Sequence, residues 1–198
     1  MNITNPREVI TKSLEVACGF DAYLKTLALH DIDISSDVEY QKNFTGYYRV
    51  RRDKEWLQEY YNYMEAHKND TELSFENILR AISTIPHKVK KTPSNNGFAT
   101  SIEPSCASKM LATLKPDHPI WDSQVVRSLN ITVDPSLSGE EKIQSYVHAY
   151  EQLTLEIRNF IQTEEGNACI KQFDITFPNL KYISPFKKID YYLWNIGK

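Results

Sequence analysis

Apolar residues recur every three to four positions along most of the chain, which is the spacing of one face of an α-helix. In residues 47–67 this face is rich in aromatic side chains, which predicts one helix with an aromatic stripe packed into the core. Residues 138–162 predict the longest helix, and Ser138 and Glu141 have the spacing of a capping box at its start.

End signals and weaker stripes predict several shorter helices. Pro6 suits a helix start, and a weak apolar stripe continues from there toward Leu27. Ser74 is a predicted N-cap, with Asn77 at the position where a capping box prefers Glu or Gln, and Pro86 ends this helix. Further helices are predicted over residues 105–115, from residue 122, over residues 167–173 and over residues 185–197.

Strand signals are sparse. Residues 174–183 alternate only weakly and contain Pro178, so they predict a loop or at most an edge strand. Residues 87–99 are rich in Lys, Pro, Asn and Gly and predict an exposed basic loop. The predicted fold class is therefore all-α.

Length and composition favour a globular protein. The chain of 198 residues is long enough for a core and suits a single helical domain over residues 1–198, with two helical lobes as the alternative. Hydrophobic residues at 41% and charged residues at 25% argue against disorder. The sequence has no apolar run near the roughly 18 residues of a membrane span, and no export signal at the N-terminus. We expect a cytoplasmic protein without membrane contact.

The overall charge is mildly acidic. A net charge of −3 and a pI near 6.0 weaken the case for a protein coated in positive charge. Local basic surface is still possible in two clusters, for which an ordinary solvated surface is the alternative. The clusters are Arg49, Arg51, Arg52 and Lys54, and His87, Lys88, Lys90 and Lys91.

Cysteine and histidine positions give no metal pattern. The three cysteines are an odd number, lie far apart and form no Cys-x-x-Cys pair, so we expect buried, reduced thiols instead of disulfides or a metal cluster. The five histidines are scattered without ligand spacing. We expect no metal and no cofactor. The cysteines are Cys18, Cys106 and Cys169.

Only residues 105–129, SCASKMLATLKPDHPIWDSQVVRSL, point to a particular chemistry. A predicted helix stops at Pro116, a tight apolar turn ends at Trp121, and a second helix begins at Asp122. A carboxylate on the first helical turn is held rigidly and can face a site. The alternative is that Asp122 is an ordinary N-cap, which stabilises a helix by about 1 kcal/mol.

Residues 119–129, PIWDSQVVRSL, resemble the signature of the helix-hairpin-helix DNA glycosylases. In that family a Pro, an apolar pair, a catalytic Asp, a Val and an Arg-x-Leu recur in this order, and the preceding Ala-Ser-Lys-Met-Leu resembles the helix that follows the hairpin. Ser-x-Ala-Ser-Lys with Pro-Ile-Trp-Asp-Ser is also similar to a group of bacterial relatives of that superfamily. The resemblance implies a compact orthogonal helical bundle, with residues 74–135 as the glycosylase-like lobe.

The resemblance also implies catalytic roles. Asp122 matches the carboxylate that stabilises the sugar cation as the base leaves and that activates a water or amine. Lys109 is the candidate Schiff-base nucleophile of a bifunctional glycosylase and lyase. If Ala107 is aligned on the shared small residue, Ser105 takes the nucleophile position instead, and a monofunctional enzyme with Asp122 and a water is the alternative.

The family's DNA-binding hairpin, a Gly-apolar-Gly, is missing, because residues 98–104 stand there and only Gly97 is near. Double-stranded DNA, the implied partner, must then be held by the amides at the start of the residue-105 helix and by side chains. Trp121 and His118 are candidates for a base pocket, and packing in the core is the alternative for Trp121. The candidate DNA contacts are Lys88, Lys90, Lys91, Ser105, Ser108 and Arg127.

Two functional hypotheses follow. The first is a DNA glycosylase-like hydrolase that acts on damaged DNA through Asp122, with or without lyase activity at Lys109. The second is a non-catalytic helical scaffold derived from the same fold, which binds nucleic acid or a protein partner and keeps Asp122 as a helix cap. The missing glycine hairpin favours the second hypothesis.

Overall fold

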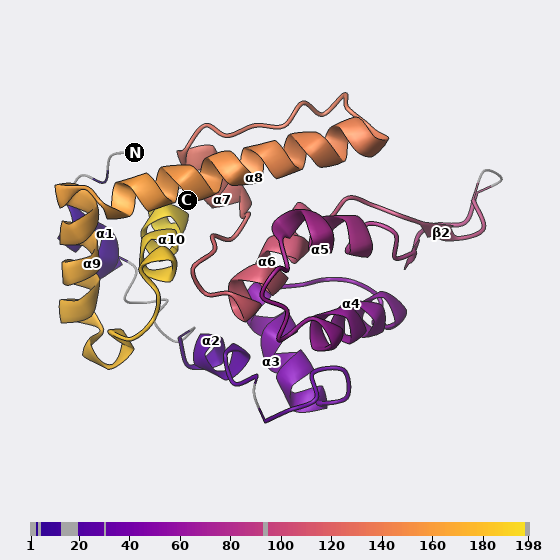
Figure 1. The fold of residues 1–198 in the computed structure, drawn as a ribbon, viewed down its shortest axis with the longest axis horizontal. Coiled ribbons are helices and arrows are strands. Elements are labelled where there is room, and N and C mark those ends of the chain that lie inside the picture. Colours follow the sequence, from indigo (N-terminus) through magenta and orange to yellow (C-terminus); the bar gives the residue numbers. More distant parts are fainter. Residues whose placement is uncertain (1–2, 4, 13–19, 30, 93–94, 197–198) are drawn as a thin grey trace. The chain divides into compact units, whose positions relative to one another are not determined.

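The computed structural model describes residues 3, 5–12, 20–29, 31–92 and 95–196. These residues are mostly helical, with one small two-stranded sheet (Figure 1). The predicted all-α class is therefore confirmed. The chain divides into two compact units, unit 1 with Met1–Ala17 and Lys115–Lys198, and unit 2 with Cys18–Leu114. The predicted lobe of residues 74–135 contributes to both units.

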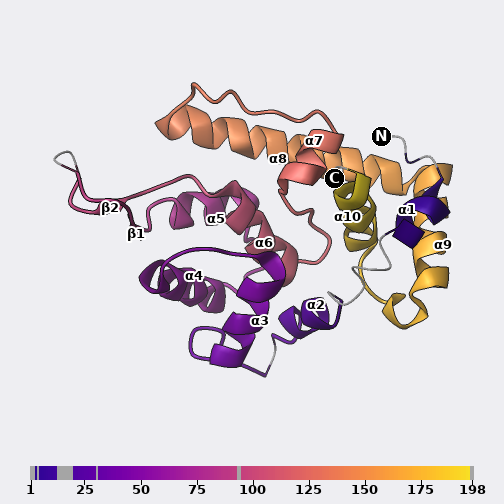
Figure 2. The same cartoon turned by 180° about the vertical axis from the view of Figure 1, so that it is seen from behind.

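Unit 2 is built from short helices and the small sheet, which Figure 2 shows from behind. Asp37 is the N-cap of the helix that begins at Val38, because its side chain accepts the backbone N–H of Tyr40 at 2.8 Å. The elements are α2 (Phe20–Thr26), α3 (Val38–Tyr48), α4 (Lys54–Ala66), α5 (Phe75–Ile82), β1 (His87–Lys88), β2 (Phe98–Ala99) and α6 (Pro104–Leu114).

An aromatic cluster forms the core of unit 2. The ring of Phe44 is fully buried and lies between Tyr48 at 4.8 Å and Tyr60 at 5.9 Å, measured between ring centroids. The hydroxyl of Tyr60 donates to the backbone carbonyl of Cys106 at 2.9 Å, which ties α4 to α6. Trp56 and Met64, which are also on α4, are buried as well. The predicted aromatic stripe is confirmed.

The prediction of one continuous helix over residues 47–67 is wrong, because α3 ends at Tyr48 and α4 begins at Lys54. Arg49 has a left-handed backbone with φ of 52°, and its N–H bonds the carbonyl of Thr45, which closes α3. Asp53 then caps α4 by accepting the N–H of Trp56 at 3.1 Å. The helical spacing of apolar side chains continues across residues 49–53, so the sequence pattern does not show that the backbone leaves helical geometry there.

The prediction of an exposed basic loop over residues 87–99 missed a strand pair, because β1 and β2 pair antiparallel there, whereas its lysines are exposed as predicted. His87 lies opposite Ala99, and Lys88 lies opposite Phe98. Gly97 has φ of 87°, a backbone conformation that glycine adopts without steric cost. We call residues 87–92 and 95–99 the β-hairpin, and Figures 1 and 2 both show its strands extending from the helices of unit 2.

The predicted N-cap of α5 forms, whereas the predicted capping box of α8 does not. At α5, Asn77 N–H donates to Ser74 Oγ at 3.1 Å, so the predicted cap is confirmed. Ser74 N–H also donates to Asn77 Oδ1 at 3.1 Å, so Asn77 completes a capping box at a position where Glu or Gln is preferred. At α8, Ser138 makes no side-chain cap bond, and the prediction is wrong. The next residue, Gly139, has φ of 53°, which is outside helical geometry.

Unit 1 packs its helices around the C-terminal helix. The predicted N-terminal helix and the helices around residues 167–173 and 185–197 are confirmed, whereas residues 13–19 of the N-terminal stripe lie outside the described residues. Helix α10 contacts α1, α7, α8 and α9. The elements are α1 (Pro6–Lys12), α7 (Ser123–Ser128), α8 (Gly139–Ile161), α9 (Glu164–Thr176), the 3₁₀ helix η2 (Pro178–Leu180) and α10 (Pro185–Ile196).

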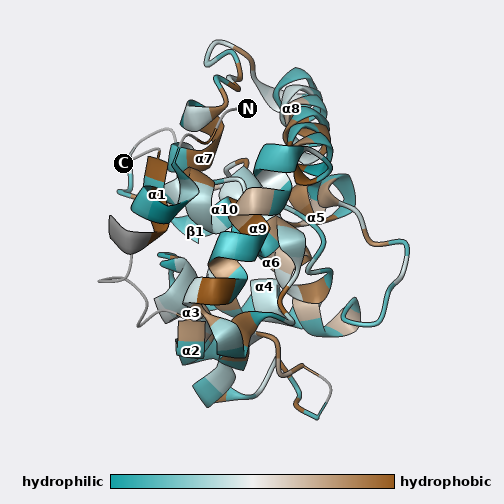
Figure 3. Cartoon of the chain, turned by 90° about the vertical axis from the view of Figure 1, so that its left-hand side faces the viewer, coloured by the Kyte–Doolittle hydropathy of each residue, from teal (hydrophilic) through white to brown (hydrophobic). Residues whose placement is uncertain are grey.

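Hydropathy is mixed along the individual helices. Figure 3 shows hydrophilic and hydrophobic residues interspersed along α8, which is typical of a helix with one buried side.

Among the described helices, none combines the length and the apolar character that a membrane crossing requires.

Candidate nucleic-acid interface

The two basic clusters of the sequence meet at the start of α4. Asp53, at the N-cap of α4, accepts the backbone N–H of Lys88 through Oδ2 at 2.9 Å. Lys88 Nζ pairs with Glu55 Oε1 at 2.7 Å. These contacts join residues that are more than thirty positions apart in sequence, so the β-hairpin is fastened to the first turn of α4.

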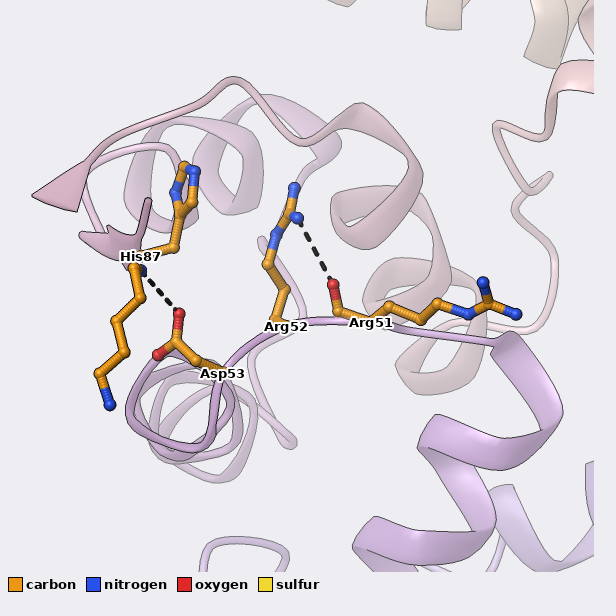
Figure 4. Close-up of a pocket in the computed structure, with 5 residues that line it drawn as sticks. Arg51, Arg52, Asp53 and His87 are labelled. Carbon is orange, nitrogen blue, oxygen red and sulfur yellow. Dashed lines mark hydrogen bonds between the residues drawn. The ribbon is translucent and has the colours of Figure 1, made fainter. Parts of the chain in front are cut away.

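A surface pocket of about 310 Å³ lies at this junction. Figure 4 shows that the side chains of Arg52 and His87 point to the same side, whereas Arg51 extends away from them. All but one of the lining residues are basic, which is unusual for a small-molecule site, where apolar lining dominates. The lining residues are Arg51, Arg52, Asp53, His87 and Lys88.

The carboxylates around the pocket are already bonded. Asp53 accepts two backbone N–H groups, and the N–H of Lys88 lowers the pKa of its carboxyl. Glu103 pairs with Arg52 and accepts the hydroxyl of Ser101 at 2.5 Å. Asp53 therefore stays charged, Glu103 compensates the charge of Arg52, and Glu55 compensates that of Lys88, so the uncompensated positive charge comes from the other cations of the two clusters.

Arg52 is held in a fixed position. Its guanidinium pairs with Glu103 and lies over the ring of Trp56, with 5.8 Å from Cζ to the ring centroid. Ser101 Oγ lies 3.4 Å from Nδ1 of His87, so a chain of polar contacts runs from His87 to Arg52. Sequence reasoning missed Ser101 and Glu103, and their pattern of Ser-x-Glu gives no distinctive signal.

Several cations near the pocket have no carboxylate partner. Arg51, Lys54, Lys90 and Lys91 are exposed, and none of them makes an ion pair with a residue that the structure describes. Residues 77–102 contain no Asp or Glu. We call the following set the basic face: Arg51, Arg52, Lys54, His87, Lys88, Lys90 and Lys91.

Asp122 in unit 1 is the N-cap of α7. Its Oδ1 accepts the backbone N–H of Gln124 at 2.9 Å, with the extended backbone usual for a cap. The side chain is half-buried, and its Oδ2 makes no hydrogen bond within the described ranges. One carboxylate oxygen therefore caps the helix, and the other has no hydrogen-bond partner among the described residues.

The proposed neighbours of Asp122 have structural contacts of their own. Trp121 is 9% exposed and its ring centroid lies 5.6 Å from that of Tyr146 in an edge-on packing. His118 is half-buried, and burial lowers its pKa, with Lys115 adding to the effect. Arg127 is exposed and donates to Gln124 at 3.4 Å.

Three other predicted site residues lie on α6 in unit 2. Lys109 and Ser105 are half-buried. Ser108 is fully buried and donates to the carbonyl of Ser105 at 3.1 Å, so its hydroxyl is not presented to solvent. Because Asp122 belongs to unit 1 and Lys109 to unit 2, a cleft shared by the two side chains stays a prediction.

The cysteines that the structure describes are unpaired and buried, whereas Cys18 lies outside the described residues. Burial raises the pKa of Cys106 and of Cys169 to about 11, so both thiols are protonated at neutral pH. Within the described part of the chain, no group of three or more His, Cys, Asp or Glu side chains is arranged to hold a metal ion.

Comparison of the chain with protein-family models, with curated protein sequences and with solved structures gave no significant match. The glycosylase resemblance of residues 119–129 therefore stays a prediction.

Proposed function

We propose that this protein is a DNA-binding helical scaffold that contacts backbone phosphates with the basic face of unit 2. The observation that carries the proposal is the convergence of two sequence clusters, one around Arg51 and one around Lys88, at one pocket. Lys and Arg contacts to phosphate supply most of the affinity of non-specific DNA binding.

The distribution of charge favours a polymer of phosphates over a single small anion. The exposed cations without partners are spread over two elements, with Lys54 at the start of α4 and Lys90 and Lys91 in the β-hairpin. A single phosphate would engage only a few neighbouring donors, whereas a nucleic-acid backbone presents charges at regular intervals. The pocket is also lined by charged or titratable residues, which disfavours a drug-like ligand.

Duplex binding measured by fluorescence anisotropy tests this proposal. The triple variant Arg51→Gln, Lys90→Gln, Lys91→Gln should bind a labelled duplex on the order of tenfold more weakly than the wild type at low salt. The control Lys42→Gln removes an exposed lysine of α3 in the same unit and should bind like the wild type. Absence of wild-type binding at low salt, or equal affinity of the triple variant, would contradict the proposal.

A second candidate is cleavage of an N-glycosidic bond by Asp122, on a fold of the helix-hairpin-helix glycosylase type. One observation favours it, namely that Oδ2 of the half-buried carboxylate makes no hydrogen bond to any described residue. An open carboxylate oxygen on a rigid helix start can stabilise a sugar cation or activate a water. Lys109 remains the proposed amine of a lyase variant of this activity.

Asp122→Asn separates catalysis from capping, because Asn caps a helix about as well as Asp. With duplexes that carry uracil, oxidised or alkylated bases, or an abasic site, this variant should lose base excision and keep wild-type stability. Asp122→Ala should lose both, at a cost of about 1 kcal/mol in the free energy of unfolding. The control Asp117→Asn changes an exposed carboxylate of the same connecting segment.

Borohydride trapping on abasic DNA tests Lys109. A covalent adduct that disappears only in Lys109→Ala supports the lyase. If no base is excised and no adduct forms while DNA still binds, the glycosylase proposal is rejected and the non-catalytic DNA-binding function is supported.

A further inference from the structure

The β-hairpin places an exposed aromatic ring beside the basic face. Phe98 on β2 is 51% exposed and lies opposite Lys88, which lines the pocket. It makes no ring contact with any residue in the described ranges. Exposure of a single aromatic ring is common at protein surfaces, and what sets Phe98 apart is that its solvent-facing half lies beside lysines, an arrangement that suits stacking on a base with flanking phosphates.

Lysines lie on the same face of the β-hairpin as Phe98. Side chains of directly opposed strand residues project to one side, so Lys88 and Phe98 share a face, and Lys90 lies two residues further along the chain, beyond the end of β1. Exposure agrees with this alternation, because Lys88, Lys90 and Phe98 are exposed whereas Val89 and Gly97 are half-buried. The bond from Val89 N–H to the Gly97 carbonyl, 2.9 Å long, continues the pairing.

From this arrangement we infer that the β-hairpin binds single-stranded DNA, with an unpaired base stacked on Phe98 and the flanking phosphates on Lys88 and Lys90. The inference rests on the proposed DNA binding and adds a preference for unpaired bases. Stacking needs a base whose face is open, which a duplex does not offer, and aromatic rings interleaved with cations are the usual means of binding single strands.

The contacts of Lys88 are compatible with this role. Its ion pair with Glu55 joins side chains that are 55% and 66% exposed, so it contributes little and yields readily to a phosphate. Lys90 makes no ion pair with a described residue. The backbone of the β-hairpin is held independently of these side chains, because Asp53 bonds Lys88 N–H and the Asn95 side chain bonds Gly97 N–H at 2.8 Å.

Three labelled probes of equal length test the inference: a single-stranded oligonucleotide, its duplex, and an oligomer in which tetrahydrofuran replaces every base-bearing sugar. Phe98→Ala should bind the single strand on the order of tenfold more weakly, as expected for loss of one stacked base. Its affinity for the duplex and for the baseless oligomer should equal that of the wild type. Phe98→Trp should retain binding to the single strand, and Phe98→Leu, which keeps apolar bulk without an aromatic face, should not.

Several outcomes would overturn the inference. These are unchanged single-strand affinity in Phe98→Ala, an equal loss with all three probes, and full binding by Phe98→Leu. Self-association of the wild type that Phe98→Ala abolishes would assign this face to a second copy of the chain. The triple variant of the basic face keeps the two proposals distinguishable, because it should weaken binding of every probe even where Phe98→Ala has no effect.

Discussion

At the residue scale, single side chains in this protein join elements that are distant in sequence. Asp53 bonds Trp56 N–H within its own helix and Lys88 N–H on β1. A carboxylate that accepts two backbone N–H groups is stabilised in its charged form. This one residue therefore caps α4 and also positions the strand that brings Lys88 to the pocket.

His118 provides a prediction of pH dependence. Burial lowers its pKa below the ordinary value of 6.5, so the unfolded chain binds a proton more readily than the folded one. Above pH 6.5 the residue costs no stability, and as the pH falls through 6.5 toward the folded value, stability decreases. His118→Gln should therefore show a smaller loss in the free energy of unfolding between pH 7.5 and 5.5 than the wild type, measured by urea titration.

The control for this prediction is His148→Gln, which removes an exposed histidine of the same unit. It should follow the wild-type profile. If His118→Gln and wild type lose stability in parallel over this range, the histidine has no part in the acid response.

At the element scale, the turn between α8 and α9 depends on one glycine. A Cβ on Gly166 would lie 1.9 Å from the carbonyl oxygen of Phe160, a backbone atom that cannot rotate away. Thr163 caps α9 here by accepting the N–H of Gly166 at 3.0 Å, which holds the two helix ends close. The sequence predicted a helix over residues 167–173 but gave no sign of the close approach that requires a glycine at position 166.

Two Gly→Ala substitutions should have opposite effects. Gly166→Ala should lower the free energy of unfolding by at least about 3 kcal/mol, because backbone atoms must move to relieve the clash. Gly46→Ala should raise it by up to about 1 kcal/mol, because Gly46 is exposed within α3, has open space around it, and alanine favours helix. Chemical unfolding of both variants measures the contrast, and similar stabilities would contradict the close approach at Gly166.

At the scale of the whole molecule, the net charge of −3 conceals a local basic surface. DNA binding by that surface releases counterions, so the logarithm of the association constant falls linearly with the logarithm of salt concentration. For a duplex, the triple variant Arg51→Gln, Lys90→Gln, Lys91→Gln should make this slope shallower by roughly 0.9 for each phosphate contact removed. Anisotropy titrations at several salt concentrations measure the slope.

Lys42→Gln should leave the slope as in the wild type. If the triple variant weakens binding by the same factor at every salt concentration, its effect is not the loss of phosphate contacts, and the basic face does not bind the DNA backbone.

The sequence by itself determined most of the helices. Periodicity and end signals are local, because a helix depends on neighbours three and four residues away and on caps at its ends. The Ser74 cap, the aromatic face of α4 and the C-terminal helix were predicted for this reason. Local patterns failed where the backbone takes a positive φ, as at Arg49 and Gly139, because a single residue of that kind ends or misaligns a helix without altering the apolar pattern.

Only the tertiary structure decided which charged residues act together. The sequence named Arg52 and Lys88 in separate clusters, and their convergence depends on Asp53 fastening the β-hairpin to α4. It likewise gave no sign that Lys188 is 3% exposed and pairs with Asp174 at 2.7 Å. Contacts between distant segments arise when whole helices and strands pack together. The spacing of residues within one segment does not determine which distant segment it will contact.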